Sequence, residues 1–270
     1  MAVIGTNPSS LNASYYSNAT SNDVNKNIKR LASGSKLSVA SDDAAGVAVS
    51  SKMDAALRRS SASSESIQSL TSFSQTANGY LSVATQQLTR LSELAMKASD
   101  GTLSNQDRAI LNNEFTKIRD NLNEQVTNAS FNGQKLFDPN QTVGGVVSED
   151  GSTNYNLSIA NASQDISGLN GIDISDTTKA LAAMTKVNES IQNLVSSQAK
   201  VNADVEALDY YSENLSTNKI NIATANSRIK DLDYAEESTN SSRNSILNRA
   251  SDAMLAQSNL KQQNVLQLLS

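Results

Sequence analysis

The chain has 270 residues, a formal net charge of −5 and 38% hydrophobic residues, but only 4% aromatic residues and no Trp, Cys or His. Without His and Cys it lacks the commonest general base, the thiolate nucleophile and the usual zinc ligands, so we expect no enzyme and no metal or cofactor site. The pI of about 4.9 without a Lys/Arg cluster argues against a nucleic-acid partner, and no run approaches the roughly 20 apolar residues of a membrane span.

The first predicted helix begins near the N-terminus. Asn7 followed by Pro8 is typical of an N-cap and a first helical residue, and Ser33-Gly34 is a typical stop. A discontinuous apolar stripe lies between them, formed by Leu11, Tyr15, Val24, Ile28 and Leu31. The opening "MAVIGTNPSS" lacks the basic region and apolar stretch of a secretory signal. If the protein leaves the cell, we therefore expect another route.

A second, long helix is predicted from the "SDD" at 41 to 43 to Gly101. Its apolar residues step in alternating fours and threes, as in one side of a coiled coil: Ala77, Leu81, Ala84, Leu88, Leu91, Ala95 and Ala98. The segment "DDAAG" at 42 to 46 suits a helix N-terminus, which carboxylates stabilise, better than a metal or phosphate loop.

A third helix is predicted to fold back on the second. "SNQD" at 104 to 107 resembles a capping box, with Ser104 followed three residues later by Asp107. One apolar face follows, made of Ile110, Leu111, Phe115, Ile118, Leu122 and Val126. The helix should end before the turn signal Asn132-Gly133.

The segment from Pro139 to Ser175 is rich in glycine and differs from its flanks. Tyr155, Leu157 and Ile159 alternate with polar residues close to the turn "EDGS", which predicts a small β-hairpin insert. Because the insert separates two long helices, we expect it to cap the tip of a helical hairpin.

The last hundred residues carry the clearest periodicity. Residues 172 to 270 contain neither Gly nor Pro, and Asp176 is a suitable N-cap for a helix reaching residue 231. One apolar row recurs every seventh residue: Val187, Leu194, Val201, Leu208, Leu215, Ile222 and Ile229. A second row becomes polar toward the C-terminus: Met184, Ile191, Gln198, Val205, Ser212 and Lys219. Two such rows predict a coiled-coil seam.

A final helix is predicted from about residue 234 to 268, with apolar residues on more than one face. We therefore expect a mainly α fold. A long antiparallel helical hairpin or coiled coil would form a rod, with a small β-hairpin insert and paired N- and C-terminal helices. Since large rings are few, burial must follow thin interfaces, which favours an elongated molecule.

Several long blocks resemble bacterial flagellin, and together the similarity covers all but about 40 central residues. The blocks are "RLASGSKLSVASDDAAGVAVSSKM" (30 to 53), "LSELAMKASDGTLSNQDR" (91 to 108), "FNGQKLF" (131 to 137), "ANSRIKDLDYAEESTNSSRNSIL" (225 to 247) and "AMLAQSNLKQQNVLQLLS" (253 to 270).

The resemblance implies a short flagellin without large outer domains. Residues 1–41 and 232–270 would form the inner coiled-coil domain, residues 42–137 and 176–231 the rod domain, and residues 138–175 the insert at its tip. The protein would polymerise with itself, possibly with other flagellins, into the extracellular filament of the bacterial flagellum. Its implied partners are the flagellar type III export apparatus, an export chaperone and the filament cap.

The resemblance also implies a recognition site. In many flagellins the matching rod stretch is recognised by Toll-like receptor 5, and "RLSELA" at 90 to 95 with "NNEF" at 112 to 115 retains Arg90, Leu94 and Glu114. Ser92 departs from the basic residue of some relatives. A native role in packing subunits along the filament is the alternative for these residues.

The two ends of the chain are predicted to form the terminal assembly interface. Its apolar residues are Leu11, Ile28 and Leu31 near the N-terminus and Val265, Leu266, Leu268 and Leu269 near the C-terminus. Two other functions remain open at this point: a hook–filament junction protein, which shares the terminal patterns, and a coiled-coil adaptor that does not polymerise.

Overall fold

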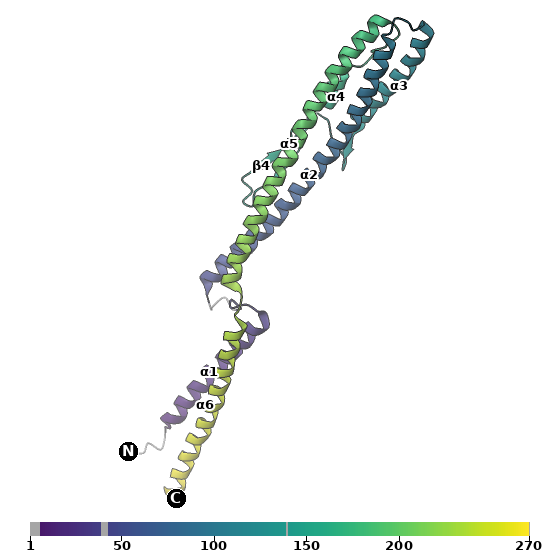
Figure 1. Ribbon diagram of the computed structural model, residues 1–270. Coiled ribbons are helices and arrows are strands. Elements are labelled where there is room, and N and C mark those ends of the chain that lie inside the picture. The colour runs from purple at the N-terminus through teal and green to yellow at the C-terminus, as the bar shows by residue number, and fades with distance from the viewer. Residues whose placement is uncertain (1–5, 39–42, 139, 270) are drawn as a thin grey trace. The chain divides into compact units, whose positions relative to one another are not determined.

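The computed structural model describes residues 6–38, 43–138 and 140–269, with side chains described up to residue 264. The fold is mainly helical, as predicted, and long helices dominate it (Figure 1). The helices are α1 (Pro8–Ser33), α2 (Ala44–Ala98), α3 (Asn105–Asn128), α4 (Ala162–Ser167), α5 (Thr177–Lys230) and α6 (Tyr234–Leu269). The short strands are β1 (Ser130–Phe131), β2 (Gln134–Lys135), β3 (Gly144–Val146) and β4 (Asn154–Asn156).

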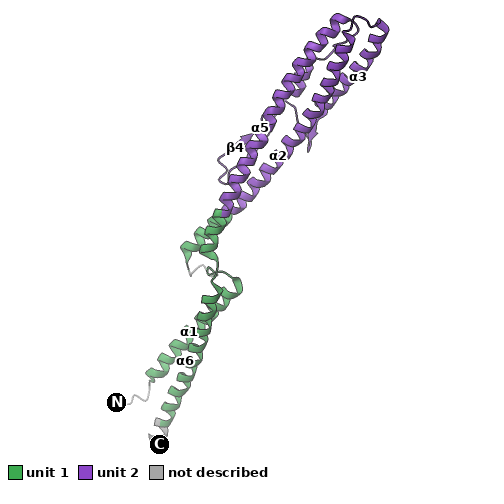
Figure 2. Ribbon diagram, in the orientation of Figure 1, with its two compact units in different colours: residues 1–55, 221–270 green, residues 56–220 purple. Residues whose placement is uncertain are grey.

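The chain divides into two compact units, which Figure 2 shows in different colours. The terminal unit contains residues 1–55 and 221–270, and the central unit contains residues 56–220. Helices α2 and α5 contribute to both units. Among the residues that the structure describes, no helix is long and apolar enough to cross a membrane.

The helix ends follow the predicted capping signals. The side chain of Asn7 accepts a hydrogen bond from the Ser10 amide at 3.2 Å, with Pro8 at the start of α1. Gly34 ends α1 in the left-handed conformation (φ 67°) and donates to the Arg30 carbonyl. Asp43 accepts from the Gly46 amide at 2.8 Å at the start of α2. These ends are therefore set by local side-chain chemistry.

The turn between α2 and α3 is held from both sides. Ser104 and Asp107 form the predicted capping box, and the Ser104 hydroxyl lowers the pKa of Asp107 by donating to its carboxylate. Arg108, which is buried, donates to the carbonyls of Ala98 (3.0 Å) and Asp100 (2.6 Å). Arg108 thus supplies partners for carbonyls at the C-terminal end of α2.

The core of the central unit lies between α2 and α5, which run antiparallel (Figure 1). All seven residues of the α2 row predicted from Ala77 to Ala98 are buried. Asn78 of α2 donates to Asn202 of α5 at 2.6 Å, so a polar contact crosses beside the apolar rows. Each fully buried Leu in such a row contributes roughly 1.5 to 3 kcal/mol.

Helix α3 covers only part of this pair, because α3 has 24 residues and α2 has 55. Gln87 of α2 donates to Asn121 and Gln125 of α3, while Phe115 and Leu122 are buried against the core. The segment that follows α3 covers the α2–α5 seam beyond the end of α3.

That segment contains two small antiparallel hairpins. Strands β1 and β2 pair through Phe131 and Gln134, with Asn132 (φ 49°) and Gly133 (φ 81°) as the two-residue turn. Positive φ at both positions is typical of a type I′ turn, which explains the Asn-Gly pair. Strands β3 and β4 pair through Gly145 and Tyr155, which confirms a hairpin around "EDGS".

The predicted position of the β3–β4 hairpin at the tip of the helical hairpin was wrong. The hairpin lies along the sides of the long helices: Arg59 of α2 bonds to Glu149 at 3.0 Å, and the Tyr155 hydroxyl donates to Asp204 of α5 at 2.8 Å. The physical reason is that the short α3 leaves part of the apolar seam bare, and Val147 and Leu157 become buried there.

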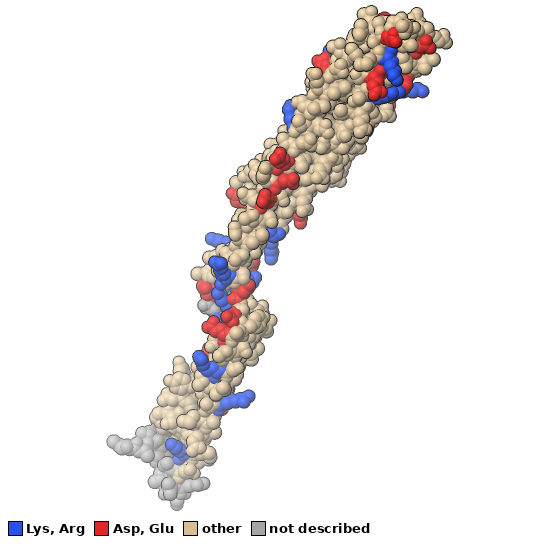
Figure 3. Space-filling view, viewed as in Figure 1, with Lys and Arg blue, Asp and Glu red and all other residues tan. Residues whose placement is uncertain are grey.

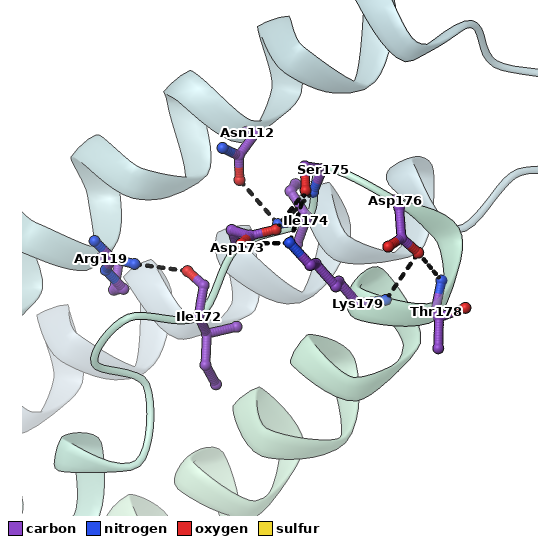
Figure 4. Close-up of polar contacts among 9 residues, drawn as sticks. All are labelled: Asn112, Arg119, Ile172, Asp173, Ile174, Ser175, Asp176, Thr178 and Lys179. Atoms are coloured by element: carbon purple, nitrogen blue, oxygen red, sulfur yellow. Dashed lines mark hydrogen bonds and ion pairs between the residues drawn. The ribbon is translucent and has the colours of Figure 1, made fainter.

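The approach to α5 is fastened to α3, as Figure 4 shows. Arg119 donates to the Ile172 carbonyl at 2.6 Å, and Asn112 accepts from the Ile174 amide at 2.8 Å. Asp176 accepts from the amides of Thr178 and Lys179, so it is the predicted N-cap. These contacts set where α5 begins, because they fix the chain before the helix and cap its first turn.

A carboxylate just before α5 is unusually acidic. Asp173 accepts from the Ser175 hydroxyl at 2.6 Å and from Lys179 at 3.0 Å, and these bonds lower its pKa to about 2. Asp173 therefore stays ionised in mildly acidic solution and keeps its partners there.

Candidate assembly surface

Helices α1 and α6 pack side by side in the terminal unit, and their shared face is polar. Asn7 donates to the Ser258 carbonyl at 3.1 Å, and Ser17 donates to Asp252 at 2.6 Å. Further bonds join Ser10 to Asn259 and Asn248 to Ser17. The described residues buried within these two helices are likewise polar: Asn27, Glu237 and Ser258. We call this face the polar seam.

A buried network lies near one end of the polar seam. With its amide oriented to satisfy both groups, Asn27 donates to Glu237 at 3.0 Å and accepts from the Ser241 amide at 3.3 Å. Arg30 lies 3.9 Å from the same carboxylate. Directional bonds of this kind fix which residues of two helices meet.

The large apolar side chains of the pair point outward instead. Tyr15 of α1 is 71% exposed, and Met254 of α6 is 65% exposed. The other strongly exposed members are Leu11, Tyr16, Ile28, Ile246, Leu247 and Leu260. On the face seen in Figure 3, few charged side chains lie over the first half of α1 and the second half of α6. Exposed apolar surfaces of this kind are common where proteins bind partners.

A groove runs between α1 and α6 on this outer surface. Its volume is about 600 Å³, and Lys261 is the one charged residue among its described lining residues. The apolar members of its lining are Ala13, Tyr16, Leu247, Ala250 and Met254. Both helices contribute apolar side chains to the groove, so an apolar side chain or the apolar face of a helix fits it.

The predicted terminal residues fall into two groups. Leu11 and Ile28 are exposed, while Leu31 is half-buried. Val265, Leu266, Leu268 and Leu269 belong to the last turns of α6, but their side chains lie outside the described residues. The structure therefore describes the N-terminal part of the predicted interface.

The row predicted on α5 is divided between the units. Five of its members are buried in the central unit: Val187, Leu194, Val201, Leu208 and Leu215. Ile222 and Ile229 are half-buried in the terminal unit. There the buried residues Ser50 and Asn226 form a hydrogen bond of 2.8 Å, so a polar contact replaces apolar packing.

The second predicted row of α5 lies at the edge of the core, where Met184 and Ile191 pack against it. Met184, Ile191, Gln198, Val205 and Ser212 are half-buried, and Lys219 is exposed. The buried neighbours of the main row are instead Ala183, Ser190, Ser197 and Asp204. Hydrophobicity could not find this row because it is mostly polar, although small residues spaced by seven were a usable signal.

The structure brings Arg90 and Glu114 together across α2 and α3. Two guanidinium nitrogens of Arg90 donate to one carboxylate oxygen of Glu114 at 3.1 and 2.6 Å, and a third bonds to Glu93 at 3.0 Å. Leu94, by contrast, is buried in the core. A partner approaching this surface therefore meets the ion pair rather than the leucine.

In the part of the chain that the structure describes, no three or more His, Cys, Asp or Glu side chains are grouped so that they could hold a metal ion.

Family models match both ends of the chain. The model of the bacterial flagellin N-terminal helical region matches residues 4–142, and that of the C-terminal helical region matches residues 184–269. These ranges include all of α1 and α6, and hence the groove between them.

Similar proteins span the whole chain. A flagellin of Halalkalibacterium halodurans is 35% identical, with 99% of both chains covered, and a flagellin of Bacillus subtilis is 33% identical, with 90% of this chain and 92% of that protein covered. A flagellar filament 30.7 kDa core protein of Treponema maltophilum is 29% identical and covers 99% of this chain and 100% of its own.

Two solved structures share the fold. The crystal structure of Bacillus cereus flagellin has a TM-score of 0.52 at 21% identity, covering 60% of this chain and 94% of that one. A putative flagellar hook-associated protein from Vibrio parahaemolyticus has a TM-score of 0.60 at 14% identity, covering 70% of this chain and 100% of that one. At these identities the two likenesses concern the fold alone.

Proposed function

This chain belongs to the bacterial flagellin family and is a structural subunit of a flagellar filament rather than an enzyme, and we propose that the outer face of α1 and α6 is where its copies join. The observation that carries the proposal is the inverted arrangement of this helix pair. Its polar groups face inward along the polar seam, and its large apolar side chains face outward.

The energetics support an intermolecular partner for that face. Fully covering a Leu, Met or Tyr-sized side chain stabilises a complex by roughly 1.5 to 3 kcal/mol. Covering the groove wall residues Leu247 and Met254 together with Tyr16 would then contribute several such increments. In a filament, this face of each subunit would bind a different surface of the next identical subunit. A heterologous contact of this kind repeats indefinitely when it does not close into a ring.

A charge placed in the groove tests this proposal. We expect Met254→Asp to reduce filament elongation strongly, because assembly would bury an unpaired carboxylate. Met254→Leu is the matched control and should elongate normally, since it keeps an apolar side chain of similar size. Elongation is measured by sedimentation after seeding with short filaments. Normal elongation of Met254→Asp, with both variants folded, would contradict the proposed face.

The route and final location are a further part of the proposal. We propose that the chain is exported through the flagellar type III apparatus with an export chaperone and assembles at the distal end beneath the filament cap, outside the cell. Its resemblance to flagellin supports this route. The thin seams of the chain and its freedom from cysteine also suit passage in an unfolded state.

The Arg90–Glu114 pair is proposed to pack subunits along the filament, with recognition by Toll-like receptor 5 as an additional role. The pair is exposed and links α2 to α3, while the burial of Leu94 leaves that residue a core role. The retained arginine and glutamate support receptor recognition, and the departure at Ser92 weakens it.

Removing both charges tests the packing role. We expect the double variant Arg90→Ala, Glu114→Ala to lose filaments while its monomer remains folded, because an exposed ion pair contributes little to folding. Electron microscopy of cells expressing the variant gives the answer, with Lys186→Ala as a control that breaks another exposed pair. Filaments of normal length and number in the double variant would overturn the packing role.

The alternatives to a filament subunit carry less support. The likeness to a hook-associated protein concerns the fold alone, whereas the relatives matched over nearly the whole chain are flagellins and filament core proteins. A non-polymerising adaptor would share the long helices but not both flagellin regions.

A further inference from the structure

The middle of the chain makes a round trip along the two long helices of the central unit. After β2 it follows α2, where Ser63 donates to the Ser148 carbonyl at 2.9 Å and Arg59 bonds to Glu149. It reverses at the turn of the β3–β4 hairpin and then follows α5 toward α4. The segment therefore touches both partners of the seam that it covers.

On its return along α5, the segment forms hydrogen bonds with α5 residues that are spaced seven apart. Ser190 donates to the Asp165 carbonyl and Ser197 donates to the Asp165 carboxylate, both at 3.0 Å. Seven residues further on, Asp204 accepts from the Tyr155 hydroxyl at 2.8 Å and from the Ser158 amide at 2.6 Å. We call Ser190, Ser197 and Asp204 the polar ladder.

Asp204 differs from the other members of the polar ladder. It is a carboxylate with only 6% of its surface exposed. Bonds to a charged acceptor are stronger than bonds between neutral groups, and a buried carboxylate that loses its donors carries a high desolvation cost. The Tyr155 ring also lies 5.6 Å from the ring of Tyr211, seven residues after Asp204. Burial, with the bond to Asp204, raises the pKa of Tyr155 to about 12.

Apolar contacts alone would not fix this segment along α5. The main row offers similar apolar side chains every seven residues, so a slide of one heptad, about 10 Å, would replace one apolar contact by another. The polar ladder does not repeat in its chemistry, because Asp204 is a carboxylate that accepts from both Tyr155 and Ser158, whereas its other two members are serines that donate. Specific buried polar contacts are known devices for setting register.

We propose that residues 143–165 are a strap whose position along α5 is set by the polar ladder, with Asp204 as its fastening point. The strap completes the cover of the α2–α5 seam where α3 has ended. This role belongs to the central unit of a single chain and does not depend on the proposed assembly surface.

The absence of cysteine from the sequence allows a direct test by thiol labelling. Ala160→Cys places one thiol on the return part of the strap at a position that is 4% exposed. Asn161→Cys, next to it and exposed, gives the labelling rate of an uncovered thiol. In the otherwise unchanged monomer, we expect Cys labelling at position 160 to be far slower than at position 161.

The fastening point is then removed. We expect Asp204→Ala to accelerate labelling of Ala160→Cys at least about tenfold, because the variant lacks the charge-assisted bonds that oppose opening of the strap. Asp209→Ala, which removes an exposed carboxylate from the same helix, should leave the rate unchanged. Circular dichroism checks that each variant keeps its helices.

A milder variant keeps the test decisive if Asp204→Ala fails to fold. Tyr155→Phe removes one hydroxyl and retains the ring, and we expect it to accelerate labelling severalfold. Unchanged labelling in every folded ladder variant, or labelling of Ala160→Cys as fast as that of Asn161→Cys before any ladder change, would overturn the strap.

Discussion

Removal of residues 261–270 is expected to abolish polymerisation while leaving the central unit folded. The deleted segment, "KQQNVLQLLS", holds Val265, Leu266, Leu268 and Leu269, which are predicted to meet neighbouring subunits. It also supplies the end of α6 and one lining residue of the groove, Lys261. Covering Leu266, Leu268 and Leu269 would contribute roughly 1.5 to 3 kcal/mol each. Their removal should therefore weaken the contact between subunits enough to stop elongation.

The truncated chain is compared with the full chain in two measurements. Elongation from short filament seeds, followed by sedimentation and electron microscopy, should fall below detection. Urea unfolding of the monomer should retain the transition of the central unit, because that unit contains residues 56–220 only. A triple variant with Leu266, Leu268 and Leu269 changed to Ser, at full length, separates loss of apolar surface from loss of chain length. Normal filaments from the truncation would refute the terminal interface.

Replacement of Phe115 by Ala is expected to destabilise the central unit by about 3 to 5 kcal/mol. Phe115 is fully buried on α3, against the core that α2 and α5 share. Its removal deletes the aromatic surface and leaves a cavity, which the surrounding packed side chains can close only in part. Few aromatic residues are available in this chain, so the loss of one from the core is large.

Urea unfolding followed by circular dichroism measures this effect. Ile110→Ala is the matched control, because Ile110 lies on the same helix but is 65% exposed, and it should change the unfolding free energy by about 0.5 kcal/mol or less. Equal effects of the two substitutions would show that α3 does not pack through Phe115.

The sequence was most informative where structure depends on local chemistry. Asn7, Ser104 and Asp176 cap their helices as predicted, because each needs only the amides of the next turn. The seven-residue row of α5 was also visible in sequence, since burial against one partner follows helical periodicity. Both kinds of signal lie within a few residues of the structure that they specify.

Features that depend on distant packing could not be predicted. The strands have two or three residues each, too few for a periodic pattern, and their position beside α2 and α5 follows from the length of α3. No sequence pattern distinguishes Asp204 from the other polar residues of α5, because its donors Tyr155 and Ser158 lie 49 and 46 residues away in the chain. Leu94 was expected at a recognition surface, and only the packing of the central unit shows that it is buried.

The polar seam between α1 and α6 has a consequence for how growth is controlled. Bonds such as Asn7–Ser258 form within one chain, so their strength is independent of how many subunits are present. The outward apolar contacts form between chains, so by mass action they depend on subunit concentration. Under the proposed assembly, the chain would stay monomeric in dilute solution. It would join a filament where subunits are delivered faster than they diffuse away.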